Sequence, residues 1–536
     1  MKRNQKLLGF SAILMSIVFL CGGCSSKKNN GADAQLAAIA ADKSLMVVSG
    51  DIKRLFDQLD IKSDDGHVVL PDYMVNALNL LGGEQGRKVV AEVQSFEGVD
   101  FTDITMSLND VDGQMLGTLA FAVTDDDDLE DWLTKAAGHV EESKTDGCEV
   151  LSTGDFAVVL SDDMGFVLFN ERKTLQGADA VAALNELKAR SAANPLSDWK
   201  KTYLAQESVV KILVDGQLSK AVTVDEAPGM TAHPFMKTMG VNDNDPYYVG
   251  MTMNLDGPTV SATIEALGPK GDVMKSPYMG RFDTSLMEYA YPTDIVGVSV
   301  AMNRLGYEMI GQSAKQAFEG EQASDFSELM DMRYYRQLVD ELVNIPAEYL
   351  TEGGLFGSFG IAEGQTLGTF NNTSPRSYHL VVAARVQPDK ALAAFDGVCA
   401  QIARMAGTPG CKGSQGGMST YVVPLSTADR FDYKKGYWIS ETMDITVALD
   451  NDVLIVTNSE IRKNASTPFS KQLFEGSCLA IQSVVNDKTP VFKDMGMKEG
   501  LEIEMAVKDG KTEARATVTD TQKNFLQAVL GVFAGR

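Results

Sequence analysis

Residues 156–168 read FAVVLSDDMGFVL, and residues 445–457 read ITVALDNDVLIVT. In both stretches, two β-prone runs flank a short turn of Asp and Asn, which tolerate the positive φ angles of tight turns. Each stretch therefore predicts a β-hairpin. Because the two stretches match residue by residue, they indicate that the chain contains the same unit twice.

Three further pairs of segments recur in the same order along the chain. Members of a pair share either an extended run followed by a helix or two extended runs joined by a turn. The pairs are 44–55 with 294–305, 119–136 with 380–399, and 252–264 with 504–518. Both members of the last pair turn at an Asp-Gly, a strong hairpin signal. Ordered matches with unequal spacings predict a duplication with insertions; the alternative is two unrelated stretches built from common α+β elements.

The predicted fold class is α+β, with two duplicated halves, each an antiparallel, hairpin-built sheet packed by helices on one face. One helix is expected over 173–206, broken near Asn194-Pro195 and buried along Val181, Leu184 and Leu187. A second is expected over 326–349.

The domain boundaries follow from the repeats and from composition. We expect repeat domain 1 over 41–267 and repeat domain 2 over 286–536. Residues 268–285 between them begin with a stretch rich in Pro and Gly and predict a linker.

The N-terminus has the form of a lipoprotein export signal. Basic residues precede an apolar run from Leu7 to Leu20, which is too short to span a bilayer and leads into Cys21-Gly22-Gly23-Cys24. We expect residues 1–23 to be cleaved, Cys24 to be lipidated, and residues 24–40 to form a lipidated tether. An ordinary secretory signal with an incidental cysteine is the alternative.

The residues after Cys24 bear on location. A multiply acylated cysteine would hold the protein firmly at a membrane. No Asp follows Cys24 directly, which is typical of outer-membrane lipoproteins, and Lys27 and Lys28 stand where surface-exposed ones often carry acidic residues. We therefore expect an outer-membrane lipoprotein of the cell envelope, periplasm-facing rather than surface-exposed.

Composition indicates an acidic globular protein with 44% hydrophobic residues and a net charge of −25. Nucleic-acid binding needs a basic stripe, and this chain has none, so nucleic acid is excluded as a partner. Membrane contact is expected through the N-terminal lipid alone.

A family resemblance rests on residues already described. The lipobox, the Ala41-Asp42-Lys43-Ser44 segment before the strand ending at Val47-Val48-Ser49, and the helix after it resemble Bacteroidetes-type lipoproteins of the domain of unknown function 4836 family. The resemblance covers nearly the whole mature chain. It implies an anchored envelope protein and carries over no catalytic residue.

Motifs for catalysis are scarce. His67, His139, His233 and His379 are placed singly without HExxH spacing, so a zincin is excluded and a His-based triad has only isolated candidates. No GxSxG nucleophile elbow occurs. The stretch GGEQGRK at 82–88 lacks the Walker spacing and predicts a plain loop.

Acidic and glycine-rich clusters have non-catalytic interpretations. The acidic residues at 110–113, 125–128 and 242–245 invite a calcium interpretation but lack the pattern of an EF-hand, and 125–128 predicts a helix N-terminus. No metal or cofactor is therefore expected. The glycine-rich stretch 353–360 predicts a close-packed turn, with a flexible contact loop as the alternative.

Four cysteines remain in the mature chain beyond Cys24. They are Cys148, Cys399, Cys411 and Cys478, and their spacing is unlike that of a metal site. A Cys399–Cys411 disulfide is one interpretation, and isolated buried thiols are the other.

Two functional hypotheses remain. The first is a non-catalytic binding or assembly protein of the envelope, with a protein or glycan partner. The alternative is a glycan hydrolase that uses two carboxylates, one with a raised pKa. A compact pocket lined by two facing acids and aromatic side chains would support the hydrolase.

Overall fold

The computed structural model describes residues 31–534 with gaps. The gaps are 65–66, 97, 112, 138, 162, 171–173, 217–238, 242–244, 310–347, 362–377, 427–429, 433–436, 440–441, 465, 487–488, 490–498 and 520. The expected signal peptide, the lipidation site at Cys24, His233 and most of the predicted helix 326–349 lie outside the described residues. The chain forms two compact units. Unit 1 comprises Met1–Val222, Pro246–Asp272 and Gln522–Arg536; unit 2 comprises Thr223–Asp245 and Val273–Thr521.

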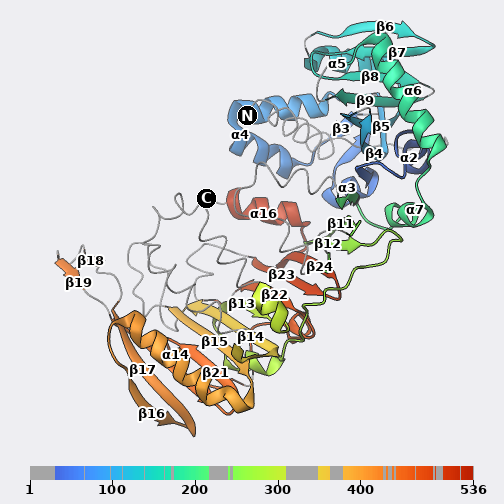
Figure 1. Cartoon of the computed structure of the whole chain (residues 1–536). Coiled ribbons are helices and arrows are strands. Elements are labelled where there is room, and N and C mark those ends of the chain that lie inside the picture. Colours follow the sequence, from blue (N-terminus) through green and yellow to red (C-terminus); the bar gives the residue numbers. More distant parts are fainter. Residues whose placement is uncertain are drawn as a thin grey trace. The chain divides into compact units, whose positions relative to one another are not determined.

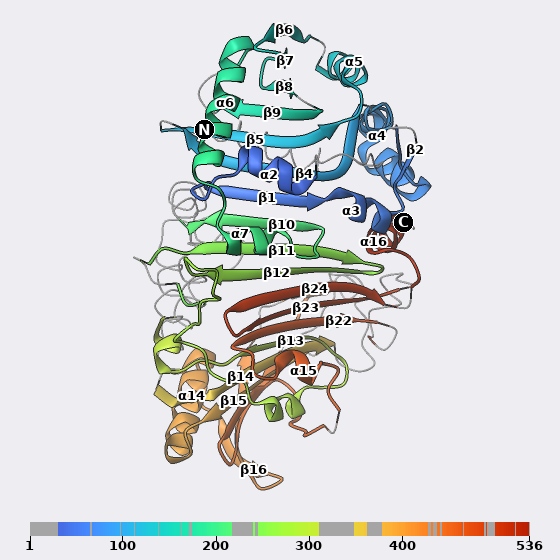
Figure 2. The same cartoon turned by 90° about the vertical axis from the view of Figure 1, so that its right-hand side faces the viewer.

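Unit 1 contains an antiparallel sheet (Figures 1 and 2). From one end to the other its strands are β12 (Thr259–Leu267), β11 (Tyr248–Asp256), β10 (Val210–Asp215), β1 (Met46–Asp51), β4 (Val99–Val111), β5 (Gln114–Val123), β9 (Met164–Asn170), β8 (Ala157–Ser161), β7 (Cys148–Ser152) and β6 (Glu141–Thr145). The predicted hairpins at 156–168 and 252–264 are confirmed as β8–β9 and β11–β12. Their turns carry positive φ angles at Asp163 and Gly257, as the sequence predicted.

Helices cover both faces of the unit 1 sheet, so the expectation of helices on one face is wrong here. On one face, α2 (Ala32–Ile39) and α6 (Gly177–Ala193) pack on β5 and on β7–β9. On the other face lie α3 (Ile52–Leu59), α4 (Asp72–Gln94) and α5 (Asp126–Ala137). Leu116 and Ala120 of β5 face the first group, and Leu119 and Phe121 face the second. A strand buried on both faces reads as a continuous apolar run, as β5 does.

The expected break in the helix 173–206 is confirmed. Helix α6 ends at Ala193, and α7 (Asp198–Leu204) begins after Pro195. The predicted stripe of Val181, Leu184 and Leu187 is buried. The unit is completed by the hairpin β2 (Lys62–Asp64) and β3 (His67–Val69) and by α16 (Phe525–Ala534), which packs on α4.

Two sequence expectations in unit 1 need revision. The predicted loop at 82–88 lies inside α4, where Gly83 adopts φ 55° and joins two helical segments across a kink. Part of the expected tether is a docked helix, because Leu36 and Ile39 of α2 are buried in unit 1. The Gln35 side chain also donates to the Asp103 carbonyl oxygen of β4, 3.0 Å away.

Unit 2 contains its own antiparallel sheet. From one end to the other its strands are β24 (Lys511–Thr519), β23 (Gly500–Lys508), β22 (Leu479–Val485), β13 (Asp294–Val300), β14 (Leu350–Ile361), β15 (Tyr378–Val386), β21 (Val453–Thr457), β20 (Thr442–Asp450), β17 (Met418–Ser426) and β16 (Cys411–Gln415). The predicted hairpins at 445–457 and 504–518 are confirmed as β20–β21 and β23–β24. A separate hairpin pairs β18 (Arg430–Asp432) with β19 (Tyr437–Ile439).

Short helices and one long helix pack on the unit 2 sheet. The 3₁₀ helix η1 (Thr284–Tyr289) and α15 (Lys471–Phe474) enclose a core around Phe356. The short η2 (Pro388–Lys390) leads into α14 (Ala391–Ala406), which packs on Val447 and Leu454. Neighbouring residues of β21, Leu454 and Ile455, belong to these two different cores, so this sheet is also covered on both faces.

The glycine-rich stretch 353–360 is neither a turn nor a contact loop. It forms most of β14, with Gly354 at φ 80° where the pairing with β15 shifts register. Phe356 in its centre is fully buried. Glycines inside a strand permit close approach of neighbouring groups; a Cβ atom at Gly360 would clash with Oδ1 of Asp294.

The cysteines and the helix lengths complete the description. Cys399 and Cys478 are buried free thiols and Cys411 is an exposed one, so this structure does not contain the Cys399–Cys411 bridge. Among the described residues, no helix combines the length and the apolar character needed to cross a membrane.

Candidate functional site

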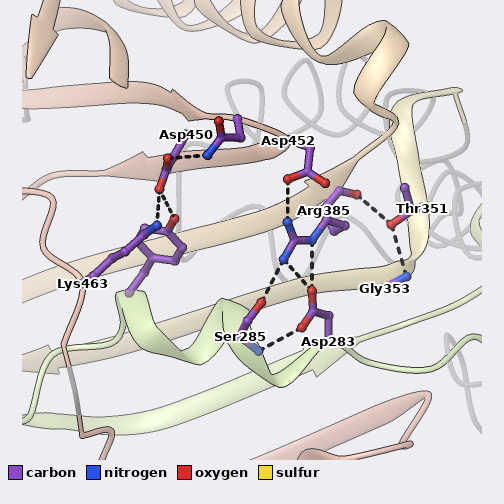
Figure 3. Close-up of polar contacts among 10 residues, drawn as sticks. Asp283, Ser285, Thr351, Gly353, Arg385, Asp450, Asp452 and Lys463 are labelled. Atoms are coloured by element: carbon purple, nitrogen blue, oxygen red, sulfur yellow. Dashed lines mark hydrogen bonds and ion pairs between the residues drawn. The ribbon is translucent and has the colours of Figure 1, made fainter. Parts of the chain in front are cut away.

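The most developed polar site of the described chain surrounds Arg385, near the end of β15 (Figure 3). Its Nη1 donates to Oδ1 of Asp452 at 2.6 Å. Its Nη2 donates to Oδ2 of Asp283 at 2.5 Å and to Oγ of Ser285 at 2.8 Å. Asp283 precedes η1 and caps it, because its Oδ1 accepts a hydrogen bond from the Ser285 amide. Arg385 therefore ties η1 to the turn between β20 and β21.

A second ion pair lies beside the first. Lys463 Nζ lies 2.5 Å from Oδ2 of Asp450, which also accepts a hydrogen bond from the Tyr289 hydroxyl at 2.7 Å. Asn451 Nδ2 donates to the other oxygen of Asp450 at 3.2 Å. Asn451 adopts φ 56° at the hairpin turn, a conformation that Asn tolerates well. The turn expected from the sequence thus places three polar side chains at one point.

These groups line a pocket of about 120 Å³. Its walls are Ser285, Glu288 and Tyr289 from η1, Arg385 from β15, the turn residues 450–453, and Lys463. Apart from Val453 and the Tyr289 ring, the lining is polar. The pocket therefore suits a ligand that hydrogen-bonds, rather than the largely apolar ligands of typical cofactor sites.

The charges of this site lower the pKa values of Asp450 and Asp283. Lys463 lowers the pKa of Asp450 through a hydrogen bond, against the effect of burial. For Asp283, burial alone would raise the pKa, but hydrogen bonds from Ser285 and the Arg385 guanidinium bring it below the ordinary value. A general acid of a glycosidase needs a raised pKa instead. These carboxylates can accept hydrogen bonds but are poorly suited to donate a proton near neutral pH.

His379, one of the isolated triad candidates, is a buried histidine beside two polar side chains. Its Nδ1 lies 2.7 Å from Oδ1 of Asp294, and its Nε2 lies 3.1 Å from Oγ1 of Thr293. The order hydroxyl, imidazole, carboxylate is that of a hydrolase triad. However, Nδ1 and Oδ1 lack the angle of a hydrogen bond despite their short separation. His379 is also 3% exposed and stacks on the Tyr291 ring, so its contacts fasten the turn before β13.

One pair of acids has the asymmetry that the hydrolase hypothesis requires. Glu502 and Glu504 lie two residues apart on β23 and so share a face of the sheet. The buried Gln482 amide donates to Oε1 of Glu502 at 2.5 Å and to Oε1 of Glu504 at 3.1 Å. Burial, and then the charge of Glu502, raise the pKa of Glu504.

A third acidic cluster joins α5 to the β6–β7 hairpin. Carboxylate oxygens of Glu130, Glu142 and Glu149 lie within 4.8 Å of one another, the one such group in the part of the chain that the structure describes. Lys144 Nζ lies 3.3 Å from Glu149 and 3.9 Å from Glu142, so a cation of the protein already compensates this charge. The cluster therefore gives no reason to assign a metal.

The acidic stretches singled out in the sequence have structural roles. Oδ1 of Asp125 accepts a hydrogen bond from the Asp128 amide, which confirms the predicted helix N-terminus at α5. Oδ1 of Asp110 accepts one from the Gly113 amide in the β4–β5 turn. Residues 242–244 of the third stretch lie outside the described chain.

The sequence did not reveal the site around Arg385. Its residues come from four separate segments, and none forms a motif by spacing. One signal was present, because Arg385 is the single charged residue in the apolar run LVVAARV at 380–386. A cation within such a run is expected to find an acidic partner in the fold.

Comparison with known proteins adds no functional information. No protein-family model matches the chain, and no curated protein matches it. Among solved structures, crystal form I of TP0453 matches with a TM-score of 0.25 and 8% identity, over 45% of this chain and 80% of that one. Crystal form III of TP0453 matches with a TM-score of 0.27 and 9% identity, over 44% and 80%. A likeness this weak supports no inference about fold or function.

Proposed function

We propose that this chain is a lipid-anchored protein of the bacterial cell envelope that binds a protein or glycan partner without catalysing a reaction. The observation that carries the proposal is that the acids around Arg385 are held in ion pairs. Each of Asp283, Asp450 and Asp452 is paired with Arg385 or Lys463. Such groups present fixed hydrogen-bond acceptors, and they favour recognition over proton transfer.

The anchor in this proposal is Cys24, held in the outer membrane with the protein facing the periplasm. Support comes from the export signal and from the residues that follow the cysteine. Helix α2 begins at Ala32, so few residues separate the lipid from unit 1. The resemblance to the domain of unknown function 4836 family points to the same kind of protein and stays a prediction.

We also propose that units 1 and 2 descend from one duplicated domain. In support, the strand order β12-β11-β10-β1-β4-β5-β9-β8-β7-β6 corresponds, strand for strand, to β24-β23-β22-β13-β14-β15-β21-β20-β17-β16. The four matched pairs of sequence segments also fall on corresponding strands. Of the two copies, unit 2 contains the site around Arg385.

Protease treatment of intact and of permeabilised cells tests the placement. We expect the mature protein to survive treatment of intact cells and to be degraded once the outer membrane is permeabilised. A periplasmic protein of known location is the control. Degradation in intact cells while the control survives would contradict the periplasm-facing orientation.

A second candidate function is favoured by one observation, the raised pKa of Glu504 beside Glu502. In this alternative the chain is a carboxylate-dependent hydrolase of envelope glycans. The test is release of reducing sugar from purified cell-wall glycan by the mature protein and by Glu504→Gln. We expect no release from either; turnover by the unsubstituted protein that Glu504→Gln abolishes would establish the hydrolase and overturn the non-catalytic proposal.

A further inference from the structure

We infer that the pocket beside Arg385 binds a neutral polyhydroxyl ligand, the terminal sugar residue of a glycan. The inference rests on the proposed binding function and names the class of ligand for it. It is carried by the free hydrogen-bonding groups of the lining, by their charge balance and by the size of the pocket.

The lining combines fixed and free polar groups. Arg385 is held by Asp283, Ser285 and Asp452, so it needs no reordering when a ligand arrives. Among the described residues, the Glu288 carboxylate has no hydrogen-bond partner, and neither does the second oxygen of Asp452. The ammonium of Lys463 has three N–H donors, and its contact with Asp450 uses one of them. The pocket therefore offers both acceptors and a donor.

The charge balance argues against an anionic ligand. Four carboxylates, those of Asp283, Asp450, Asp452 and Glu288, surround the two cations Arg385 and Lys463. The excess of negative charge opposes a phosphate or a carboxylate.

A metal ion is disfavoured by geometry. The carboxylates that line the pocket do not form a group with three ligand atoms close enough for one ion; in the described chain that arrangement occurs at Glu130, Glu142 and Glu149. Asp450 and Asp452 are already neutralised by protein cations. A neutral ligand rich in hydroxyl groups matches the lining best, since each hydroxyl both donates and accepts and can use the free carboxylate oxygens and the Lys463 ammonium together. An organic cation could use the carboxylate oxygens but would face the Lys463 ammonium.

The size of the pocket agrees with one sugar residue. A volume of about 120 Å³ corresponds to roughly four water molecules at about 30 Å³ each. A sugar ring replaces such waters, and its hydroxyls reproduce their hydrogen bonds with the lining groups. A glycan chain can continue outward, so the pocket would recognise a chain end.

Saturation-transfer NMR with the mature chain tests the inference. The probes are a panel of neutral methyl hexopyranosides, with inorganic phosphate and calcium chloride as separate competitors. We expect saturable binding of at least one glycoside that phosphate and calcium do not displace. The variant Glu288→Gln should weaken this binding about three- to tenfold through the loss of a charged acceptor. Glu513→Gln, on the exposed side of β24, is the matched control and should leave binding unchanged.

Three outcomes would overturn the inference. They are no saturable binding by any glycoside, competition by phosphate at equal concentration, and binding that Glu288→Gln leaves unaltered. Circular dichroism of each variant verifies that it is folded. The proposed function fails separately, by protease sensitivity in intact cells or by glycan hydrolysis, so the two results are distinguishable.

Discussion

Oδ1 of Asp294 lies 2.7 Å from Nδ1 of His379, and both side chains are buried. The two residues stand at the ends of β13 and β15, with Gly360 of β14 paired to each of them. Because Gly360 has no side chain, the carboxylate and the imidazole can meet across the middle strand. Oδ2 of Asp294 also accepts a hydrogen bond from the Tyr291 amide at 2.8 Å. Asp294 therefore holds the start of β13 through contacts on both of its oxygens.

Replacement of His379 tests this role. We expect His379→Gln to lower the free energy of unfolding by about 1–3 kcal/mol, because it removes a buried ring that stacks on Tyr291 and packs against the Asp294 carboxylate. Urea unfolding followed by tryptophan fluorescence measures the change. Thr293→Val is the comparison and should cost less, because Thr293 is only partly buried. Equal stability of His379→Gln and the unsubstituted protein would show that the contact contributes nothing.

Arg385 should be more sensitive to substitution than an ordinary surface cation. Arg385→Met leaves Asp283 and Asp452 without a shared cation, and we expect a loss of about 2–4 kcal/mol, somewhat below that of a fully buried pair. Arg385→Lys keeps the charge but cannot reach three acceptors with a planar group, so it should recover only part of the loss. Thermal unfolding measures both variants. Full recovery by Lys would show that charge alone matters at this position.

The acids of the site predict a specific pH dependence. The pKa values of Asp283 and Asp450 are lowered in the folded protein. Groups of this kind add stability above the ordinary carboxyl pKa of about 3.9, and the added stability is lost as the pH falls through the folded pKa. Asp283→Asn should therefore be less stable than the unsubstituted protein at pH 6, and the difference should shrink below about pH 4. A difference that stays constant over this range would contradict the assignment.

The thiols should differ sharply in reactivity. Burial raises the pKa of Cys399 to about 12 and that of Cys478 to about 11, so few thiolates form there near neutral pH. Cys411 is exposed. Iodoacetamide at pH 8 should modify Cys411 rapidly and the other two only after unfolding in urea, as peptide mass spectrometry would reveal. A Cys399–Cys411 cross-linked peptide in a non-reduced digest would contradict the structure.

Local sequence signals predicted the local structure well. The Asp and Asn turns at Asp163 and Asn451 specify their hairpins because few other residues accept positive φ angles. The break before α7 follows from Pro195, and the start of α5 follows from the capping carboxylate of Asp125. Each of these features depends on interactions between near neighbours in the chain.

The failures arose where distant packing decides the structure. The glycines at 82–88 weaken a helix by about 1 kcal/mol each in isolation. Burial of Val90 and Val93 favours helix on the far side, so a second helical segment resumes after the kink at Gly83. The glycines of β14 are strand residues because β14 pairs with β13 and β15, and Gly360 leaves room for Asp294 and His379. The site around Arg385 joins segments whose proximity depends on the strand order, which spacing does not encode.

A lipid anchor at Cys24 would place the protein in the envelope, where we propose that it binds its partner. The most direct measurement is metabolic labelling with an alkyne fatty acid, followed by capture of the protein and by membrane fractionation. We expect the unsubstituted protein and Cys21→Ser to be labelled and to sediment with the outer membrane, whereas Cys24→Ser loses both properties. Label retained on Cys24→Ser, or an unlabelled protein released from the membrane fraction, would contradict the claim.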